Sequence, residues 1–71
     1  MSNIGPQVKI GNHNIINSFA NIEHEVTMGE FNHIGPNAAI CGRSQIANRV
    51  FIGSNSTVIE NISVPDGVII G

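Results

Sequence analysis

The residues of this sequence that could do chemistry gather around His24. Glu25 follows it directly, and Gly42 stands eighteen residues further along the chain. Histidine is the side chain most often used as a general base, and a backbone N–H group that a glycine leaves accessible can stabilise a developing oxyanion. If the fold stacks Gly42 on His24, the two residues form a general base beside an oxyanion-stabilising donor.

Cys41 is the other reactive side chain in this stretch. It is the only cysteine, so no disulfide can form within the chain. A cysteine nucleophile needs a base beside it to form the thiolate, and His24 is expected at the next corner position, so we do not expect Cys41 to be a nucleophile. No group of histidine and cysteine residues has the spacing of metal ligands, and no metal is expected.

The composition narrows the functional classes. Of the 71 residues 11% are charged, and the formal net charge is −2. Binding to nucleic acid requires a clustered basic patch, and only Lys9, Arg43 and Arg49 are basic besides histidine. No signal sequence opens the chain, and no apolar run could span a bilayer. We expect one cytoplasmic domain over residues 1–71 that binds neither nucleic acid nor membrane.

A six-residue repeat predicts the fold that must position these residues. Every sixth position is aliphatic or Met: Ile4, Ile10, Ile16, Ile22, Met28, Ile34, Ile40, Ile46, Ile52, Val58, Val64 and Ile70. This period fits neither an amphipathic helix nor an alternating strand, and hexapeptide repeats are typical of a β-helix. Three repeats make one triangular coil, so the chain supplies nearly four coils. We expect all of these positions to be buried, each contributing roughly 1.5–3 kcal/mol.

The third and fourth positions of each repeat are predicted to form the corners of the coil. They hold turn residues such as Pro36-Asn37 and Ser54-Asn55. Glycine and asparagine accept the positive φ that a sharp corner often needs, and we expect them to supply it. Corner A of one coil is residues 24–25, corner B is residues 30–31 and corner C is residues 36–37. Residues one coil apart then stack at roughly 4.8 Å in a parallel ladder.

This stacking places the two candidate histidines on opposite sides of the prism. Gly42 lies one coil beyond His24 at corner A, while His33 points outward from the face between corners B and C. That face lies opposite corner A. His24 and His33 could therefore share a site only if they meet across an interface between subunits.

The column of stacked residues through His33 supports such an interface. The other members of the column are Ile15, Phe51 and Ile69. A solvated face should be polar, so this apolar stripe predicts a packing surface. Head-to-tail packing of the face against a neighbour gives a closed ring, and the triangular cross-section favours a homotrimer.

Three stretches resemble a known family: Asn17-x-x-Ala20-x-Ile22-Glu23-His24-Glu25, Gly29-Glu30-Phe31-x-His33-Ile34 and Cys41-Gly42. They resemble the hexapeptide-repeat acyltransferases of the sialic acid O-acetyltransferase and bacillosamine-pathway sugar N-acetyltransferase type. The resemblance covers most of the chain, from about Asn17 onward. It implies an all-β fold, a left-handed parallel β-helix, although parallel crossovers are otherwise usually right-handed.

The resemblance also implies a function, which is acetyl transfer from acetyl-CoA to a hydroxyl or amino group of a sugar or nucleotide-sugar. His24 matches the catalytic base, and Glu25 matches the acidic residue that orients it. His33 matches a second histidine near the acceptor, and Gly42 matches the glycine whose N–H meets the acetyl oxygen. Asn17 matches an asparagine of the same motif. The direct attack needs no metal.

The chain departs from this family in two respects. Members usually carry an N-terminal α/β domain that binds the nucleotide-sugar, and they continue into further coils and a tail that help to hold CoA. Both regions are absent from this sequence. The alternative interpretation is a non-catalytic β-helix that serves as a trimerisation or scaffold module, or a catalytic core that lacks activity.

Overall fold

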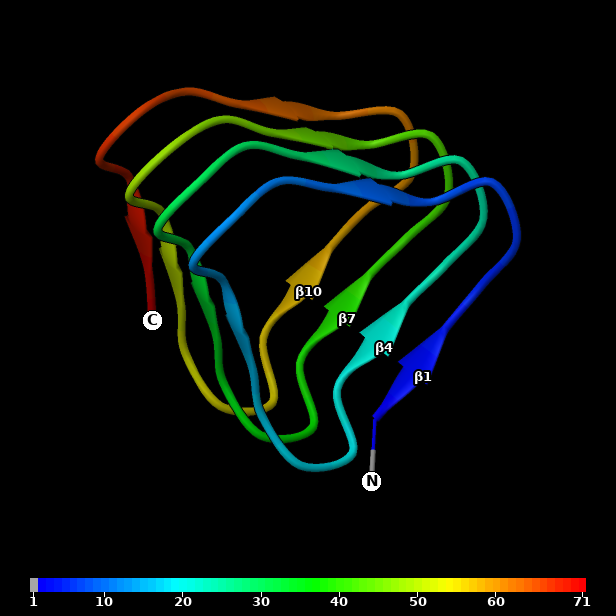
Figure 1. Ribbon diagram of the computed structural model, residues 1–71. Coiled ribbons are helices and arrows are strands. Elements are labelled where there is room, and N and C mark those ends of the chain that lie inside the picture. Colours follow the sequence, from blue (N-terminus) through cyan, green and yellow to red (C-terminus); the bar gives the residue numbers. More distant parts are fainter. Residues whose placement is uncertain (1) are drawn as a thin grey trace.

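Residues 2–71 wind into about four stacked triangular coils in a computed structural model (Figure 1). In Figure 1 the chain runs anticlockwise as it recedes from the viewer, so the coil is left-handed. The prediction of an all-β, left-handed parallel β-helix is confirmed. Residues 2–71 form no helix, and hence none that could cross a membrane.

Each face of the prism is one parallel sheet of four strands. We name each sheet by the two corners between which it lies. The CA sheet consists of β1 (Asn3–Ile4), β4 (Asn21–Ile22), β7 (Ala39–Ile40) and β10 (Thr57–Val58). The AB sheet consists of β2 (Lys9–Ile10), β5 (Thr27–Met28), β8 (Gln45–Ile46) and β11 (Ser63–Val64). The BC sheet consists of β3 (Ile15–Ile16), β6 (His33–Ile34), β9 (Phe51–Ile52) and β12 (Ile69–Ile70).

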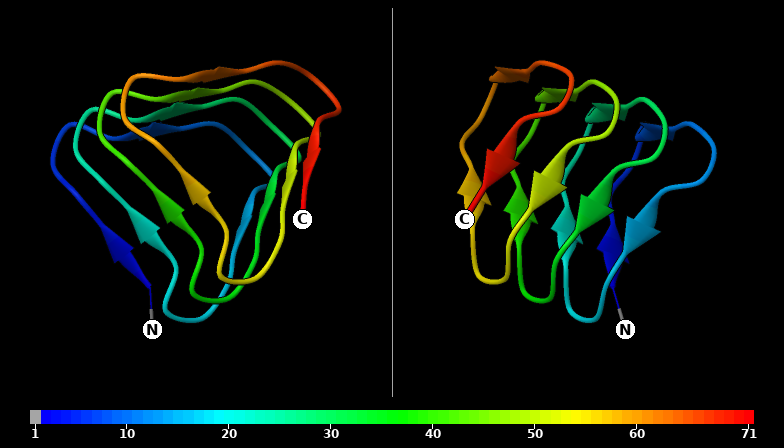
Figure 2. Two further views of the ribbon diagram at one scale, coloured as in Figure 1. Left: turned by 180° about the vertical axis from the view of Figure 1, so that it is seen from behind. Right: turned by 90° about the vertical axis from the view of Figure 1, so that its left-hand side faces the viewer.

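The register between coils is the predicted step of 18 residues. Asn3 pairs with Asn21, and His33 pairs with Ile15 on one side and Phe51 on the other. The views in Figure 2 show that successive coils follow nearly the same path, so that each corner lies on the corner of the coil before it. The predicted columns of stacked side chains are therefore real.

The core runs along the axis of the prism. Eight repeat positions are buried: Ile22, Met28, Ile34, Ile40, Ile46, Ile52, Val58 and Val64. The prediction that all of them are buried is wrong for Ile4, which is 51% exposed, and for Ile10, Ile16 and Ile70, which are partly buried. These four residues lie in the first coil or the last strand, at the two open ends of the prism.

Every corner contains one residue in the left-handed backbone region. The second residue of each turn has a φ between 54° and 74°. Asparagine or glycine occupies four of these positions, as expected: Asn37, Asn55, Asn61 and Gly67. The other seven hold residues other than glycine or asparagine, and positive φ is uncommon for most of them: Gln7, His13, Phe19, Glu25, Phe31, Arg43 and Arg49. The repeat imposes the turn geometry at each of them, whatever residue stands there.

Two polar side chains are buried beside the apolar core, Asn32 and Ser44. The amide of Asn32 donates to the Ala47 carbonyl at 2.9 Å and accepts from the Val50 N–H at 2.8 Å. Buried polar groups are tolerated when they are hydrogen-bonded. Asn32 thereby ties corner B of one coil to corner B of the next, and Ser44 has an equivalent role beside corner A.

Candidate active site at corner A

Corner A brings His24, Glu25 and Gly42 together, as the register predicts. His24 and Glu25 form the turn between β4 and β5, and Gly42 and Arg43 form the same turn one coil later. The Arg43 N–H donates to the His24 carbonyl at 3.0 Å, which fixes the distance between the two turns. The relative placement of these residues is therefore set by the ladder rather than by flexible side chains.

The imidazole of His24 lies directly against Gly42. A β-carbon built on Gly42 would stand 2.6 Å from Nε2 and 2.7 Å from Cε1 of His24. Gly67 is the only glycine with a positive φ within residues 2–71, so the backbone at Gly42 does not require glycine. Glycine leaves the space that the ring occupies, and any side chain at this position would displace the ring.

The environment of the Gly42 backbone differs from the expectation in one respect. Gly42 is buried beneath the His24 ring, so the prediction that its backbone lies accessible beside the imidazole is wrong for this position of the ring. Its N–H group makes no hydrogen bond to any residue in the range 2–71. An unpaired backbone N–H can donate to a ligand, and at Gly42 the His24 ring would first have to move aside.

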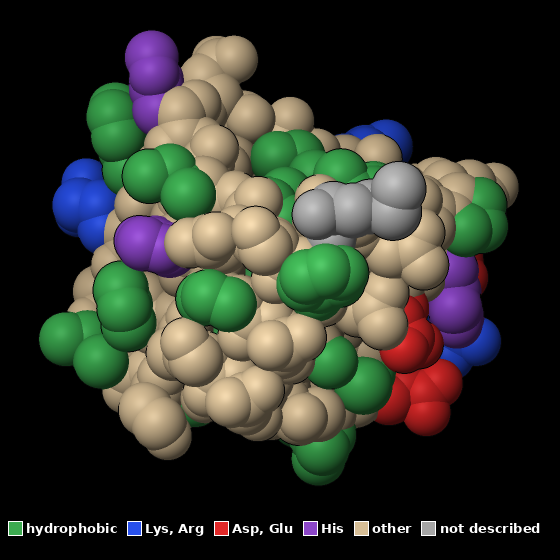
Figure 3. All heavy atoms as spheres, turned by 90° about the horizontal axis from the view of Figure 1, so that it is seen from below, with side chains coloured by type: hydrophobic (Ala, Val, Ile, Leu, Met, Phe, Trp, Pro, Cys, Tyr) green, Lys and Arg blue, Asp and Glu red, His purple; other side chains and the backbone are tan. Residues whose placement is uncertain are grey.

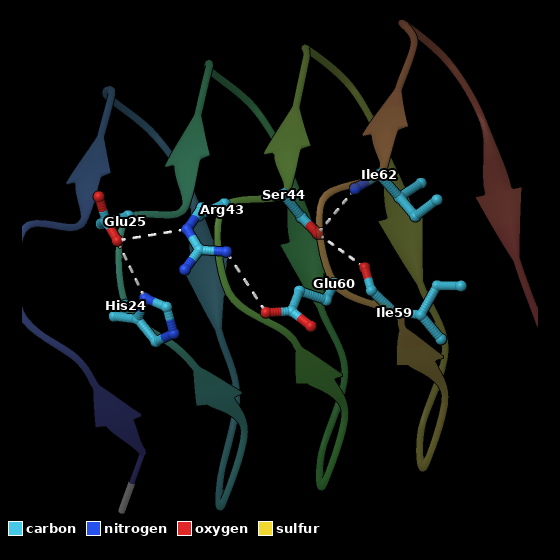
Figure 4. Close-up of polar contacts among 7 residues, drawn as sticks. All are labelled: His24, Glu25, Arg43, Ser44, Ile59, Glu60 and Ile62. Atoms are coloured by element: carbon cyan, nitrogen blue, oxygen red, sulfur yellow. Dashed lines mark hydrogen bonds and ion pairs between the residues drawn. The ribbon is translucent and has the colours of Figure 1, made fainter.

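Glu25 holds the other nitrogen of the ring. His24 Nδ1 and Glu25 Oε1 are 3.2 Å apart, and Figure 4 shows the carboxylate turned toward the imidazole. With a proton on Nδ1 donated to the carboxylate, the neutral ring carries its free electron pair on Nε2. Nε2 accepts no hydrogen bond from residues 2–71. A neutral imidazole held in this way can accept a proton at Nε2.

The charged side chains of corner A extend over two further coils. Arg43 Nε lies 3.6 Å from the same Oε1 atom of Glu25, and Arg43 Nη1 lies 3.5 Å from Glu60 Oε2. In Figure 3 acidic side chains gather at the right-hand edge of the molecule, beside a histidine and a basic side chain. The sequence correctly predicted Arg43 over Glu25. It missed the contact with Glu60, although opposite charges on neighbouring columns were a visible signal.

His33 and Asn17, the other two candidate residues, do not join this site within one chain. His33 lies on β6 of the BC sheet, with its ring centre 5.0 Å from that of Phe51 at an angle of 60°. Asn17 accepts the Ser18 N–H at 2.8 Å through its side-chain oxygen, which caps the turn at corner C. The BC sheet lies across the prism from corner A, as predicted (Figure 1).

The BC sheet is the apolar face of the prism. Ile15, Phe51 and Ile69 point outward from it and are 55%, 42% and 76% exposed. The outward positions on the CA sheet are Asn3, Asn21, Ala39 and Thr57, and those on the AB sheet are Lys9, Thr27, Gln45 and Ser63. Among the outward strand positions, large apolar side chains therefore stand on the BC sheet alone, while Phe19, Phe31, Ile59 and Ile62 are exposed at or beside the corners.

Cys41 lies half-buried at the end of β7, next to the site. Burial, together with the nearby carboxylates of Glu23 and Glu60, raises the pKa of its thiol above the ordinary value. A raised pKa lowers the fraction of thiolate, which is the nucleophilic form. The raised pKa therefore disfavours a nucleophilic role for Cys41. Among residues 2–71, no three His, Cys, Asp or Glu side chains are grouped as metal ligands would be.

Comparison with known proteins agrees with this architecture. The family described as bacterial transferase hexapeptide (six repeats) matches residues 25–60, which is slightly more than half of the chain. The matched segment begins at Glu25 and includes Gly42 and Glu60. No solved structure matches the chain. The chain belongs to the bacterial transferase hexapeptide family.

Proposed function

We propose that this chain is an acetyltransferase that uses acetyl-CoA to acetylate a hydroxyl or amino group of a sugar or nucleotide-sugar. The observation that carries the proposal is the contact between the His24 imidazole and Gly42, with Glu25 on the opposite ring nitrogen. A base whose Nδ1 faces a carboxylate, next to an unpaired backbone N–H, suits attack on a thioester carbonyl once the ring uncovers that N–H. We also propose that residues 1–71 are one domain and that it acts in the cytoplasm.

In the proposed reaction His24 Nε2 removes the proton of the acceptor hydroxyl or amine. The acceptor atom forms a bond to the carbonyl carbon of the acetyl thioester, and the carbonyl oxygen becomes an oxyanion. The C–S bond then breaks, and the proton on His24 passes to the departing CoA thiolate. The carboxylate of Glu25 stabilises the imidazolium that exists between these two transfers.

Gly42 has two roles in this proposal. Its missing side chain gives the imidazole its place, and its N–H donates to the oxyanion. Because the ring covers Gly42, that donation requires the His24 side chain to turn away from the backbone. The side chain of His24 is 41% exposed, so it has room to turn toward solvent.

The complete site is proposed to form between subunits of a homotrimer. Burying the apolar BC face of one chain against corner A of the next would bring His33, and Asn17 beside it, to His24 of the neighbour. Hexapeptide β-helix proteins commonly trimerise, and a three-sided prism with one apolar face closes into a ring of three. His33 and Asn17 would then contact the acceptor, and His24 would act on it.

A second candidate function is a non-catalytic trimerisation or scaffold module. The observation that favours it is the apolar BC face, which needs none of the corner A residues in order to assemble. In this case the polar contacts at corner A would be ordinary surface ion pairs, which contribute little to stability.

Calorimetric titration with acetyl-CoA, with the oligomeric state measured by light scattering, separates the two candidates. An acetyltransferase binds acetyl-CoA saturably as a trimer and releases CoA thiol when a sugar acceptor is added. The His24→Ala variant should lose thiol release while His13→Ala, a histidine in a turn at corner B, should keep it. A folded trimer that does not bind acetyl-CoA would contradict the proposed acetyltransferase and favour the scaffold module.

A further inference from the structure

We infer that Arg43, held in place by Glu60, is a positioning residue that keeps the Glu25 carboxylate on Nδ1 of His24. This inference rests on the proposed function of His24 as a base. Arg43 touches neither ring nitrogen in the structure, so it would act only through Glu25. The inference follows from the two carboxylates that the Arg43 guanidinium contacts at once (Figure 4).

One oxygen of Glu25 has two partners. Oε1 lies 3.2 Å from His24 Nδ1 and 3.6 Å from Arg43 Nε, and the second contact comes from the following coil. The Glu25 side chain is 48% exposed, so a carboxylate with the imidazole as its only partner could turn into solvent. The positive charge of Arg43 on the same oxygen favours the rotamer that faces the ring. When Glu25 adopts that rotamer, it favours the His24 tautomer that is protonated on Nδ1 and carries its free electron pair on Nε2.

Arg43 is itself held from the other side. Its Nη1 lies 3.5 Å from Glu60 Oε2, in the turn of the next coil. The Asn61 N–H in that turn donates to the Gly42 carbonyl at 2.9 Å. The guanidinium therefore bridges two carboxylates whose turns are tied to its own. The two contacts use different nitrogens of the planar guanidinium, Nε toward Glu25 and Nη1 toward Glu60.

The turn that carries Glu60 is anchored from inside the prism by Ser44. Its hydroxyl donates to the Ile59 carbonyl at 2.8 Å and accepts from the Ile62 N–H at 3.2 Å, on either side of the turn (Figure 4). Ser44 is fully buried. The backbone that carries Glu60 is therefore anchored on both sides of the turn, which favours the Glu60 carboxylate as the fixed partner of Arg43.

The ion pairs among Glu25, Arg43 and Glu60 orient the carboxylate beside His24, and they do not stabilise the fold. The side chains of Glu25, Arg43 and Glu60 are 48%, 55% and 62% exposed, and ion pairs at such exposure contribute little to the free energy of unfolding. Removal of Arg43 should therefore leave the fold intact. What should change is the geometry at His24, where even a small displacement lowers the rate of a proton transfer steeply.

The test uses Arg43→Met in the full chain, with Arg49→Met as the matched control. Arg49 occupies the same left-handed turn position at corner B, with φ 54° against 62° at Arg43, and forms no ion pair within residues 2–71. The readout is the tautomer of the neutral His24 imidazole, measured from its ¹⁵N chemical shifts. Arg43→Met should lower the share of the tautomer protonated at Nδ1. Glu60→Gln should lower it less, and Arg49→Met should leave it unchanged.

Kinetics supply the second readout. With a working acetyl-transfer assay, Arg43→Met should lower kcat by up to about a hundredfold with little change in KM for acetyl-CoA. In a chain that already carries Glu25→Gln, the same substitution should have no further effect, because Arg43 acts through Glu25. An unchanged His24 tautomer in Arg43→Met, or an equal loss of kcat in the Glu25→Gln chain, would overturn the inference. If the wild-type chain transfers no acetyl group, the proposed function fails while the tautomer comparison still decides the role of Arg43.

Discussion

The imidazole of His24 occupies the space that a side chain on residue 42 would need. A β-carbon on Gly42 would lie 2.6 Å from His24 Nε2, well inside van der Waals contact. The glycine and the candidate base are separated by a full coil, so the requirement for glycine arises from stacking and not from the turn. This relationship links the six-residue repeat to the proposed chemistry.

Gly42→Ala should therefore disturb the base without disturbing the fold. The backbone at Gly42 does not have a positive φ, so alanine fits the turn, and its methyl group must displace the half-exposed imidazole. We expect an unchanged circular dichroism spectrum and a loss of acetyl transfer of about a hundredfold, because the base is misplaced by about the size of a methyl group. Steady-state kinetics measure the loss.

The control for this prediction is the double substitution His24→Ala with Gly42→Ala. Without the ring, the methyl group on residue 42 meets no imidazole, so it should not change the free energy of unfolding of the His24→Ala chain, which is already expected to lack acetyl transfer. A further loss of stability in the double variant would show that Gly42 is required for a reason other than its contact with His24.

Phe51→Asp should dissociate the proposed trimer. Phe51 stands in the middle of the apolar BC face, and assembly would bury the new carboxylate without a partner. Light scattering should report a monomer with an intact β-helix. Gln45→Asp, which places the same charge on the neighbouring AB sheet in the same coil, should remain a trimer. A Phe51→Asp chain that still forms trimers would mean that another face makes the interface.

Ser44→Ala should lower the stability more than any surface change. It leaves the Ile59 carbonyl and the Ile62 N–H without their buried partner, which costs about 1–3 kcal/mol. Ser54→Ala, at an exposed corner, should change the free energy of unfolding by no more than about 0.5 kcal/mol. Urea unfolding of the two variants provides the comparison. Equal midpoints would contradict the anchoring role of Ser44.

The Cys41 thiol should react slowly at neutral pH. Burial and the carboxylates of Glu23 and Glu60 raise its pKa in the folded chain, so alkylation by iodoacetamide should need a higher pH than in the urea-unfolded chain. Glu23→Gln should shift the profile toward lower pH. Since the folded state holds this proton more tightly, stability should fall as the pH rises from the unfolded pKa through the folded one. Identical profiles for folded and unfolded chains would refute the shift.

Much of the fold was predictable because the repeat is regular. An aliphatic residue at every sixth position fixes which side chains face the axis, and a step of 18 residues then fixes which residues stack. The columns through His24 and His33 followed from counting alone. The exposure of Ile4 did not, because the repeat marks a core position without telling whether it lies at an open end of the prism.

The corners show the limit of reasoning from residue type. Local preference assigns positive φ to glycine and asparagine, and the structure requires it of Phe19, Glu25 and Arg43 as well. The hydrogen bonds between coils, and the apolar positions on either side of each turn, outweigh the local cost at these residues. At seven of the eleven turns, tertiary packing overrides the local conformational preference of the residue.

The sequence by itself determined the class of fold, the inward and outward faces, and the approach of Gly42 to His24, because all three depend only on period. Only the tertiary structure decided that one oxygen of Glu25 serves both His24 and Arg43, and that the ring covers Gly42. It also decided that Glu60 holds the other side of the guanidinium. These facts depend on side-chain rotamers and on distances of a few ångströms between coils. The order of residues along the chain sets which columns are neighbours, but it does not set which way a side chain turns within its column.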